Sequence, residues 1–254
     1  MQLPEWIAER GIGETRLARI EHDAIVEARI ELDGVVAAGT KLNATLIRAG
    51  RNGVARDEAG TEYLLPSGAS GIPEGAAAQI VVTRSAIPGV EPWKRPLAKL
   101  AEADETDAPV EPVAGTMPAD WDDLIEEARS GIARFAGGEL RLSATPAMTL
   151  IDVDGTLPAK ELATAGARAA ARAILRLGIG GSIGIDLPTI AGKTDRQAIG
   201  DAIDAILPKP FERTAMNGFG FVQIVRPRRR ASLLELAADR APFEARALIH
   251  RVGR

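Results

Sequence analysis

Two short apolar stretches, each carrying an aspartate, decide how the second half of this chain folds. Residues 150–156 read Leu-Ile-Asp-Val-Asp-Gly-Thr, and residues 183–188 read Ile-Gly-Ile-Asp-Leu-Pro. Each apolar run is typical of a buried strand, and an alanine-rich, helix-like segment lies between them. A right-handed crossover would make the two strands parallel, so Asp152 and Asp186 should emerge at the same carboxyl edge of one sheet.

Two carboxylates at one sheet edge indicate a site for a divalent cation. Mg²⁺ prefers oxygen ligands, keeps several waters, and is usually held by one or two carboxylates together with substrate phosphates. The alternative is that an acidic residue ends a strand only because the next position is solvated.

Composition limits the class of protein. The chain has 254 residues, of which 46% are hydrophobic and 26% charged, which suits one large or two small domains. It has no cysteine, which excludes disulfides and thiolate metal sites. Because no segment has the length and apolarity of a membrane span and the first residues lack a secretion-signal pattern, we expect a cytoplasmic protein without a membrane partner.

Charge is unevenly distributed behind the net value of −4. The stretch from Glu102 to Glu127 is acidic and contains no Lys or Arg, so it should repel nucleic acid. From Pro208 to the last residue, the sequence contains ten Lys and Arg but only four acidic residues. This basic end is interpreted either as a surface that follows a phosphate backbone or as an ordinary solvated face.

Turn signals and composition divide the chain into four parts. Closely spaced short runs in residues 36–100 suit a small OB-type β-barrel; they cover residues 42–47, 53–56, 62–65 and 78–83. Residues 1–35 are interpreted as strands that pack on the domain with the aspartates. Residues 101–119 are interpreted as a flexible acidic linker.

The last part, residues 120–254, is predicted to be an α/β domain. Apolar spacing and stop signals predict helices over 121–132, 160–177 and 195–207. Besides the strand that ends at Asp186, strands are predicted over 139–143, 148–153 and 219–225.

These segments resemble the ribonuclease E/G family of endoribonucleases. Residues 13–20 and 25–31 look like the family's opening strands, and the barrel region resembles its OB-type RNA-binding domain. The second half is similar to its catalytic domain, a DNase-I-like or RNase-H-like mixed sheet, in residues 124–128, 137–140, 150–152, 180–186 and 219–223. The resemblance implies an α/β catalytic domain behind an OB-type barrel.

The resemblance also implies an activity: metal-dependent cleavage of single-stranded RNA, in RNA processing or decay, that leaves a 5′-phosphate and a 3′-hydroxyl. Its two metal aspartates fall on Asp152 and Asp186, and the cofactor would be Mg²⁺ or Mn²⁺. The family has asparagine where Asp154 stands, so Asp154 is a further candidate to bind the metal or to orient the attacking water.

Candidate RNA contacts follow from position in the sequence. Lys193, Arg196 and Arg226 flank the aspartates and are interpreted as phosphate contacts or solvated charges. Phe219 is interpreted as a base-stacking or packing residue, and Gly220 as a point of close approach to RNA. In the barrel, the candidates are Tyr63, which either stacks or packs, and the basic Lys94.

Several features depart from the family. The module that senses a 5′-monophosphate is missing between barrel and catalytic domain, so we expect little preference for 5′-monophosphorylated RNA. The zinc-linking cysteines are also missing, so any oligomer would form without a zinc link. The family's first barrel aromatic is replaced by Val54, and Asn217-Gly218 lacks the arginine usual before the Phe-Gly segment.

Two other functions stay open. Residues 152–157, Asp-Val-Asp-Gly-Thr-Leu, also match the first motif of haloacid-dehalogenase-type phosphatases, with Asp152 as nucleophile and Asp154 as general acid. The third hypothesis is a non-catalytic RNA-binding or scaffold relative that kept the fold and the basic end.

Overall fold

The computed structural model describes residues 5–87, 94–102 and 112–252. The chain divides into two compact units, which are described separately. The first comprises residues 1–30, 112–228 and 232–254, and the second comprises residues 31–111 and 229–231. Within the described ranges, no helix combines the length and apolarity needed to cross a membrane. The protein is a mixed α/β protein with two mixed sheets and a closed five-stranded β-barrel.

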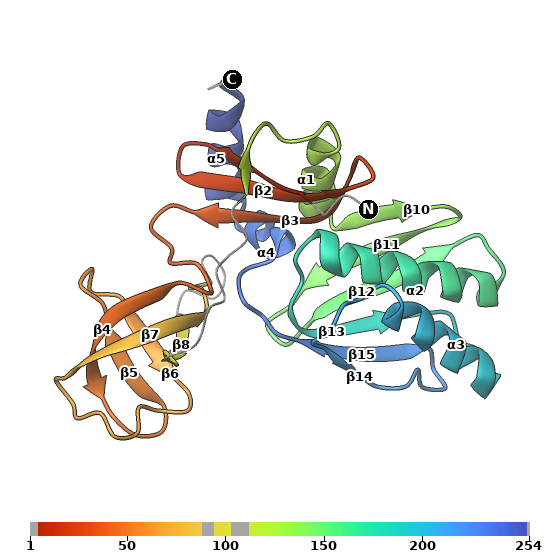
Figure 1. The fold of residues 1–254 in the computed structure, drawn as a ribbon. Helices are drawn as coiled ribbons and strands as arrows, with labels where there is room; N and C mark the ends of the chain where they lie inside the picture. Colours follow the sequence, from red (N-terminus) through yellow and green to blue (C-terminus); the bar gives the residue numbers. More distant parts are fainter. Residues whose placement is uncertain (1–4, 88–93, 103–111, 253–254) are drawn as a thin grey trace. The chain divides into compact units, whose positions relative to one another are not determined.

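One sheet of the first unit joins strands from the start of the chain to a segment far along it. Its order is β3 (Ala24–Leu32), β2 (Glu14–Glu21), β1 (Glu5–Arg10) and β9 (Val113–Ala114) (Figure 1). His22 and Asp23, at the β2–β3 turn, both have positive φ, as a two-residue type I′ hairpin requires. β9 pairs in parallel with β1, so residues 113–114 of the predicted linker belong to this sheet.

Only part of the remaining predicted linker, residues 101–119, is described by the structure. Residues 103–111 lie outside the described residues. In the remainder, Met117 is buried and its backbone N–H donates to Glu9 Oε2 at 2.5 Å.

The second sheet of the first unit carries both aspartates. Its strand order is β10 (Ile132–Phe135), β11 (Gly138–Ala144), β12 (Thr149–Gly155), β13 (Gly181–Asp186), β15 (Phe221–Arg226) and β14 (Glu212–Arg213). β12 and β13 are parallel and are joined through α2 (Ala159–Arg176), while the other neighbours are antiparallel. The predicted strand-helix-strand unit with adjacent parallel strands is confirmed.

Helices cover one face of this sheet. α2 lies across β10, β11 and β12, and α3 (Lys193–Asp204) packs beside it (Figure 1). The covered face buries alternate residues such as Ile151, Val153, Ile183 and Ile185. α2 packs closely because its inner residues are small: a Cβ at Gly166 would lie 2.3 Å from Val153 Cγ1. The other face of β12 exposes Leu150, Asp152 and Asp154 to solvent.

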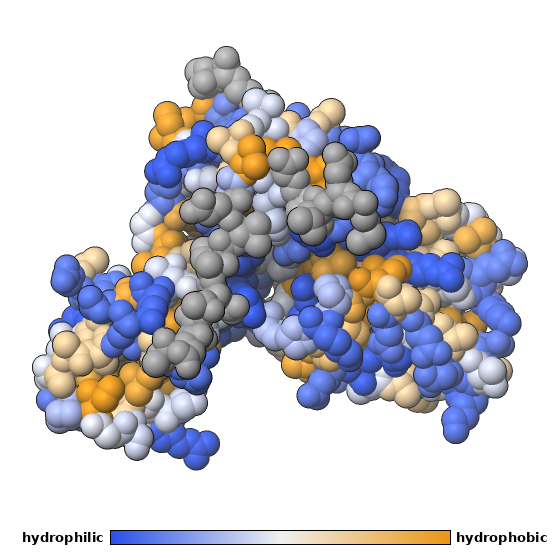
Figure 2. All heavy atoms as spheres, in the orientation of Figure 1, coloured by the Kyte–Doolittle hydropathy of each residue, from blue (hydrophilic) through white to orange (hydrophobic). Residues whose placement is uncertain are grey.

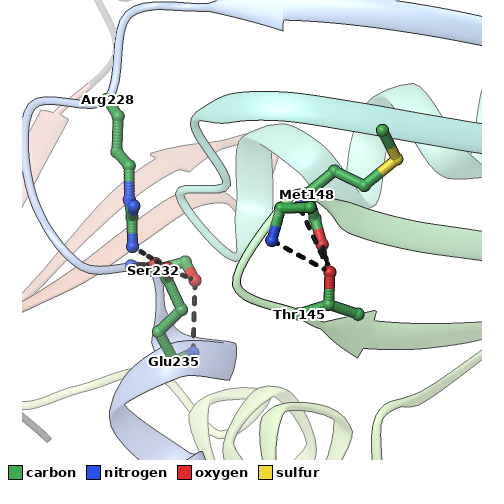
Figure 3. Close-up of polar contacts among 6 residues, drawn as sticks. Thr145, Met148, Arg228, Ser232 and Glu235 are labelled. Atoms are coloured by element: carbon green, nitrogen blue, oxygen red, sulfur yellow. Dashed lines mark hydrogen bonds and ion pairs between the residues drawn. The ribbon is translucent and has the colours of Figure 1, made fainter. Parts of the chain in front are cut away.

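Three further helices complete the first unit: α1 (Trp121–Ser130), α4 (Leu233–Ala238) and α5 (Arg240–Val252). α4 begins with a capping box, in which Ser232 Oγ accepts from Glu235 N–H and Glu235 Oε2 accepts from Ser232 N–H at 2.8 Å (Figure 3). Arg228 donates to the same Glu235 carboxylate. Thr145 closes the β11–β12 turn by donating its hydroxyl to the Met148 carbonyl at 2.7 Å (Figure 3).

The second unit is the closed barrel. Its strands are β4 (Lys41–Arg48), β5 (Gly53–Arg56), β6 (Glu62–Leu65), β8 (Leu97–Leu100) and β7 (Ala77–Arg84), in that order around the barrel. Inward side chains including Leu46, Tyr63, Leu65 and Ile80 form its core. The predicted small barrel in this part of the chain is confirmed.

Candidate functional site

Asp152 and Asp186 lie side by side on neighbouring parallel strands. They are direct register partners between β12 and β13, and both side chains are exposed. Adjacent strands are about 4.8 Å apart, and residues opposite each other in register project to the same face of the sheet. The backbone therefore holds the two carboxylates together without any contribution from a loop.

Asp154 shares this face but has its own hydrogen bond. It lies two residues beyond Asp152 on β12, and its Oδ1 accepts from Gly155 N–H at 2.8 Å. Its register partner is Glu139 of β11 rather than a residue of β13. Across the described ranges, no group of three or more Asp, Glu or His side chains is arranged to hold a metal ion. Asp154 thus does not complete a three-carboxylate centre with Asp152 and Asp186.

The other neighbour of Asp152 is a cation that the sequence did not single out. Arg141 of β11 is the register partner of Asp152, and its Nε donates to Glu139 Oε1 at 3.1 Å. The Arg141 side chain is 60% exposed, so an anion that approaches the carboxylates can reach it. The tight turn between β11 and β12 fixes this register, which is the signal that would have revealed Arg141.

Phe219 is held at the same sheet edge by a compact loop. The side-chain carbonyl of Asn217 accepts from the backbone N–H of Phe219 at 2.9 Å and from that of Phe221 at 3.0 Å. Because Phe221 is the register partner of Asp186, the loop begins beside the carboxylates. The Phe219 side chain is 85% exposed. The alternative that Phe219 is a packing residue is therefore wrong, and the residue remains a candidate for stacking on a base.

Gly220 has a structural reason for being glycine. Its φ is 98°, and a Cβ there would lie 2.0 Å from the Leu187 carbonyl oxygen. Leu187 N–H in turn donates to the Gly220 carbonyl at 3.2 Å. The missing side chain is thus required for contact between two loops of the protein, and this contact accounts for Gly220 without an approach to RNA.

The two basic residues of α3 that were predicted to contact phosphate differ in whether their side chains are already engaged within the protein. Lys193 is the first residue of α3, is exposed, and follows the loop that leaves Asp186. Arg196 instead donates from Nη1 to the carbonyls of Ile190 and Ala191, at 2.8 and 2.7 Å. Arg196 therefore fixes the loop before α3, and Lys193 is the better candidate for a phosphate.

Arg226 is at the wrong end of the sheet for the role predicted from its position in the sequence. Its register partner on β13 is Gly181, five residues before Asp186. At about 3.3 Å per residue, that places Arg226 roughly 16 Å from the carboxylates along the strand. Its Nη1 donates to the Ile179 carbonyl at 3.1 Å. Arg226 thus lies on β15, the strand next to β13, but it is far from the Asp186 carboxylate.

In the barrel unit, Tyr63 is a core residue. Its relative exposure is 0%, and its hydroxyl donates to Asp57 Oδ2 at 2.8 Å. Burial, together with the Asp57 carboxylate, raises the pKa of the Tyr63 hydroxyl above its ordinary value. The prediction that Tyr63 stacks on RNA is therefore wrong, because its ring is enclosed in the barrel. Lys94 is partly exposed just before β8.

Two arginines contact one half-buried carboxylate of the barrel, that of Glu62. Arg56 and Arg95 each lie 2.7 Å from an oxygen of Glu62. The hydrogen bond from Arg56, assisted by the charges of Arg95 and Arg48, lowers the pKa of the Glu62 carboxyl. Arg56 and Arg95 thus share one acid, so two guanidinium groups lie against a single carboxylate on the barrel.

Comparison of the sequence with protein-family models and with curated proteins gave no match in either case. The case for function therefore rests on the geometry of the residues themselves.

Proposed function

We propose that this chain is a divalent-metal-dependent endoribonuclease that cleaves single-stranded RNA to leave 5′-phosphate and 3′-hydroxyl ends. The observation that carries the proposal is the register pairing of Asp152 with Asp186 on the exposed sheet face, with Phe219 at the same edge. The pairing offers hard oxygen ligands, and the exposed ring offers a surface for a nucleobase.

The residues fit Mg²⁺ or Mn²⁺. Both cations favour carboxylate oxygens, and Mg²⁺ commonly takes one or two of them while water and substrate phosphate supply the other ligands. Asp152 and Asp186 would hold the ion. When bound, it would polarise a phosphoryl oxygen and lower the pKa of a bound water.

The chain's own residues supply the remaining functions. Arg141, beside Asp152, is placed to bind a phosphate oxygen and to balance the charge that develops on the reacting phosphate. Phe219 would stack on an unpaired base next to the scissile bond, and Lys193 would contact the neighbouring backbone. Unpaired bases are needed for such stacking, which favours single-stranded RNA over duplex.

The same proposal assigns finer fold types to the two parts. The five-stranded closure of the barrel, with β6 parallel to β8, supports an OB-type barrel. The mixed sheet with β12 and β13 at its centre supports the DNase-I-like or RNase-H-like catalytic domain of the ribonuclease E/G family. The two arginines that share Glu62, Arg56 and Arg95, are the barrel's basic groups that support binding of an RNA backbone.

A non-catalytic RNA-binding relative is the second candidate. It is favoured by one observation: across the described residues no group of three or more Asp, Glu or His side chains is arranged to hold a metal ion, so the two carboxylates lack a third protein ligand. A haloacid-dehalogenase-type phosphatase would instead need Asp154 as a free general acid, whereas Asp154 accepts a hydrogen bond from Gly155 N–H.

Cleavage of a 5′-labelled single-stranded oligoribonucleotide in Mg²⁺ or Mn²⁺ tests the proposal. We expect internal products with 3′-hydroxyl ends, and a loss of at least about 100-fold for Asp152→Asn and for Asp186→Asn, because even indirect partners of metal ligands are worth 10–100-fold. Asp122→Asn, an exposed acid of α1, is the matched control and should keep full activity. Binding without cutting would support the scaffold instead, and release of phosphate from a small phosphomonoester would support the phosphatase.

A further inference from the structure

The sheet face that exposes Asp152 and Asp186 carries further side chains beside the two carboxylates. On β13, Gly184 lies two residues before Asp186, and its register partners are Leu150 on β12 and Gln223 on β15. Register partners and every second residue of a strand project to the same face, so these residues share the face of the carboxylates. They form a row about 6.6 Å from the carboxylates, because each residue of a strand adds about 3.3 Å.

Gly184 allows two apolar side chains to meet in the middle of this face. A Cβ at Gly184 would lie 2.5 Å from Cζ of Phe221 and 3.0 Å from Cδ2 of Leu150. Both side chains therefore lie over the glycine. Phe221 is the register partner of Asp186, so the surface that they form adjoins the carboxylates. We refer to Leu150, Gly184 and Phe221 as the apolar floor.

The apolar floor is accessible from solvent. Leu150 is 39% exposed, Phe221 is half-buried, and Ser143, the register partner of Leu150 on β11, is exposed. Aromatic and apolar side chains of this kind are the surfaces on which proteins stack unpaired bases. The floor can therefore support a flat ring laid on the sheet.

Gln223 supplies polar groups at the edge of the floor. Its Nε2 donates to Ser182 Oγ at 3.2 Å, and its backbone N–H donates to Thr214 Oγ1 at 3.1 Å. The contact with Ser182 uses one of the two amide hydrogens. Among the described residues, no group bonds to the second hydrogen or to Oε1. The amide thus offers one donor and one acceptor, side by side, to a molecule on the floor.

Charge on this face favours a path over the floor for a polyanion. On the far side of the carboxylates, Asp154 adds a further exposed negative charge. The row that contains the floor is uncharged from β11 to β15 and consists of Ser143, Leu150, Gly184 and Gln223. A nucleic-acid strand that reaches the carboxylates is therefore repelled less over the floor than over Asp154.

We propose that the apolar floor and Gln223 bind an adenine base of the RNA strand next to the scissile bond, an inference that rests on the proposed function and adds a base preference to it. The base lies on Leu150 and Phe221, and its edge faces Gln223. Adenine presents the N6 amine as a donor beside N7 as an acceptor, which is the pattern that a glutamine amide pairs with.

Phe219 and the floor lie on opposite sides of the carboxylates. β15 begins at Phe221 and runs away from Asp186 past Gly184, whereas Gly220 contacts Leu187, the residue after Asp186. The site therefore has places for two unpaired bases, with the scissile phosphate between them.

Photocrosslinking of the full chain in EDTA tests the base site without metal or cleavage. The probe is a single-stranded oligouridylate that carries one 8-azidoadenosine. We expect mass spectrometry to find the label on Leu150, Phe221 or Gln223. An unlabelled RNA with adenosine at that position should compete at least about fivefold better than one with uridine, the lower bound for a bidentate base contact.

A matched pair of variants tests the role of the amide. Gln223→Leu keeps the approximate size of the side chain but removes its hydrogen bonds, so the preference for adenosine should fall below about twofold. Gln197→Leu removes an exposed amide from α3, which packs beside α2 on the covered face, and should keep the preference. Circular dichroism and thermal unfolding check that both variants are folded. In Mg²⁺, the wild type should cut next to adenosine, and Gln223→Leu should cut without this preference.

Three outcomes would overturn the inference: no label on the floor or Gln223, equal competition by adenosine and uridine, or equal losses of preference in Gln223→Leu and Gln197→Leu. If the protein still cleaves RNA in those cases, the proposed nuclease stands without this base site. Labelling of the floor with a preference for adenosine, but no cleavage in Mg²⁺ or Mn²⁺, would support the base site and contradict the nuclease.

Discussion

Among single residues, Phe219 is notable because its aromatic ring is exposed to solvent on a loop that is itself well fixed. An 85% exposed aromatic ring contributes little to folding, yet two backbone hydrogen bonds to the Asn217 side chain fix the loop that presents it. Because these hydrogen bonds fix the loop, the ring is presented at a defined place beside Asp186, as stacking on a base requires. The proposed partner is an unpaired base next to the carboxylates.

Replacement of this ring should weaken RNA binding without harming the fold. Stacking of one base on an aromatic ring is worth about 1–3 kcal/mol, so Phe219→Ala should raise the Kd for a single-stranded oligoribonucleotide by roughly 5- to 150-fold. Fluorescence anisotropy measures the change. Leu248→Ala removes an exposed apolar side chain from α5 and should leave the Kd unchanged; equal Kd values for Phe219→Ala and the wild type would refute the stacking role.

Alanine substitutions at Gly220 and Gly218 should have different effects on the stability of the protein. Gly220→Ala would place a Cβ 2.0 Å from the Leu187 carbonyl oxygen at a φ of 98°. Strain of this kind costs about 1–3 kcal/mol, so the free energy of unfolding in urea should fall by at least that amount. Gly218→Ala has no atom within 4 Å of the added Cβ and should change stability by less than about 0.5 kcal/mol. Similar losses in both variants would contradict this interpretation of the loop.

Single residues also show where sequence reasoning succeeds. Asp152 and Asp186 could be paired from the sequence because a helix between two apolar strands fixes both their direction and their edge. Arg226 could not be placed in the same way, because β15 runs antiparallel to β13 and carries the arginine away from the site. Tyr63 was ambiguous because its neighbours Glu62 and Leu64 do not decide which face of a short strand turns inward.

At the scale of elements, α3 is tied to the edge strand β14 by a bidentate ion pair. Arg213 Nε and Nη2 donate to the two carboxylate oxygens of Asp204, each at 2.7 Å, and the guanidinium packs against Gly200. The hydrogen bond from Arg213 lowers the pKa of Asp204 below its ordinary value of 3.8, and the same contact raises the pKa of Arg213. The pair thus fastens the end of the sheet to the helix that follows the carboxylates.

This pair predicts a pH-dependent stability. Because the pKa of Asp204 is lower in the folded protein, its contribution is complete above pH 3.8 and is lost as the pH falls through the lower, folded value. Asp204→Asn should therefore cost up to about 1 kcal/mol at neutral pH, a small value because the carboxylate is partly solvated. Urea unfolding at several pH values measures this cost, which should shrink in acid. If the stability lost in Asp204→Asn instead grows as the pH falls, the ion pair with Arg213 does not stabilise the protein as predicted.

Local sequence patterns predicted most helices and strands. They did not predict which strands pair when the partners are far apart in the sequence. The helix predicted over 160–177 is α2, at Ala159–Arg176, because its alanine-rich periodicity and the following glycines act locally. The two-residue strand β9 was interpreted as linker, since its only reason to be extended is a parallel contact with β1 from the other end of the chain. Arg141 was missed for a related reason, since its importance depends on its cross-strand partner.

The whole molecule consists of two compact units, and the barrel has a hydrophobic core of its own. The overall charge of −4 disfavours general attraction to RNA, so the proposed binding would depend on local cations such as Arg141 beside Asp152 and the arginines beside Glu62. The chemistry is assigned to one place only, the pair of carboxylates on β12 and β13. All other contacts would orient RNA toward that pair.

Titration with Mn²⁺, followed by electron paramagnetic resonance of the free ion, shows whether Asp152 and Asp186 share a cation. The pairing of Asp152 with Asp186 predicts one bound Mn²⁺ whose affinity falls at least about tenfold in both Asp152→Asn and Asp186→Asn, with Asp154→Asn close to the wild type. If Mn²⁺ binds equally well after either of the first two substitutions, the two carboxylates do not share a cation and the account is wrong.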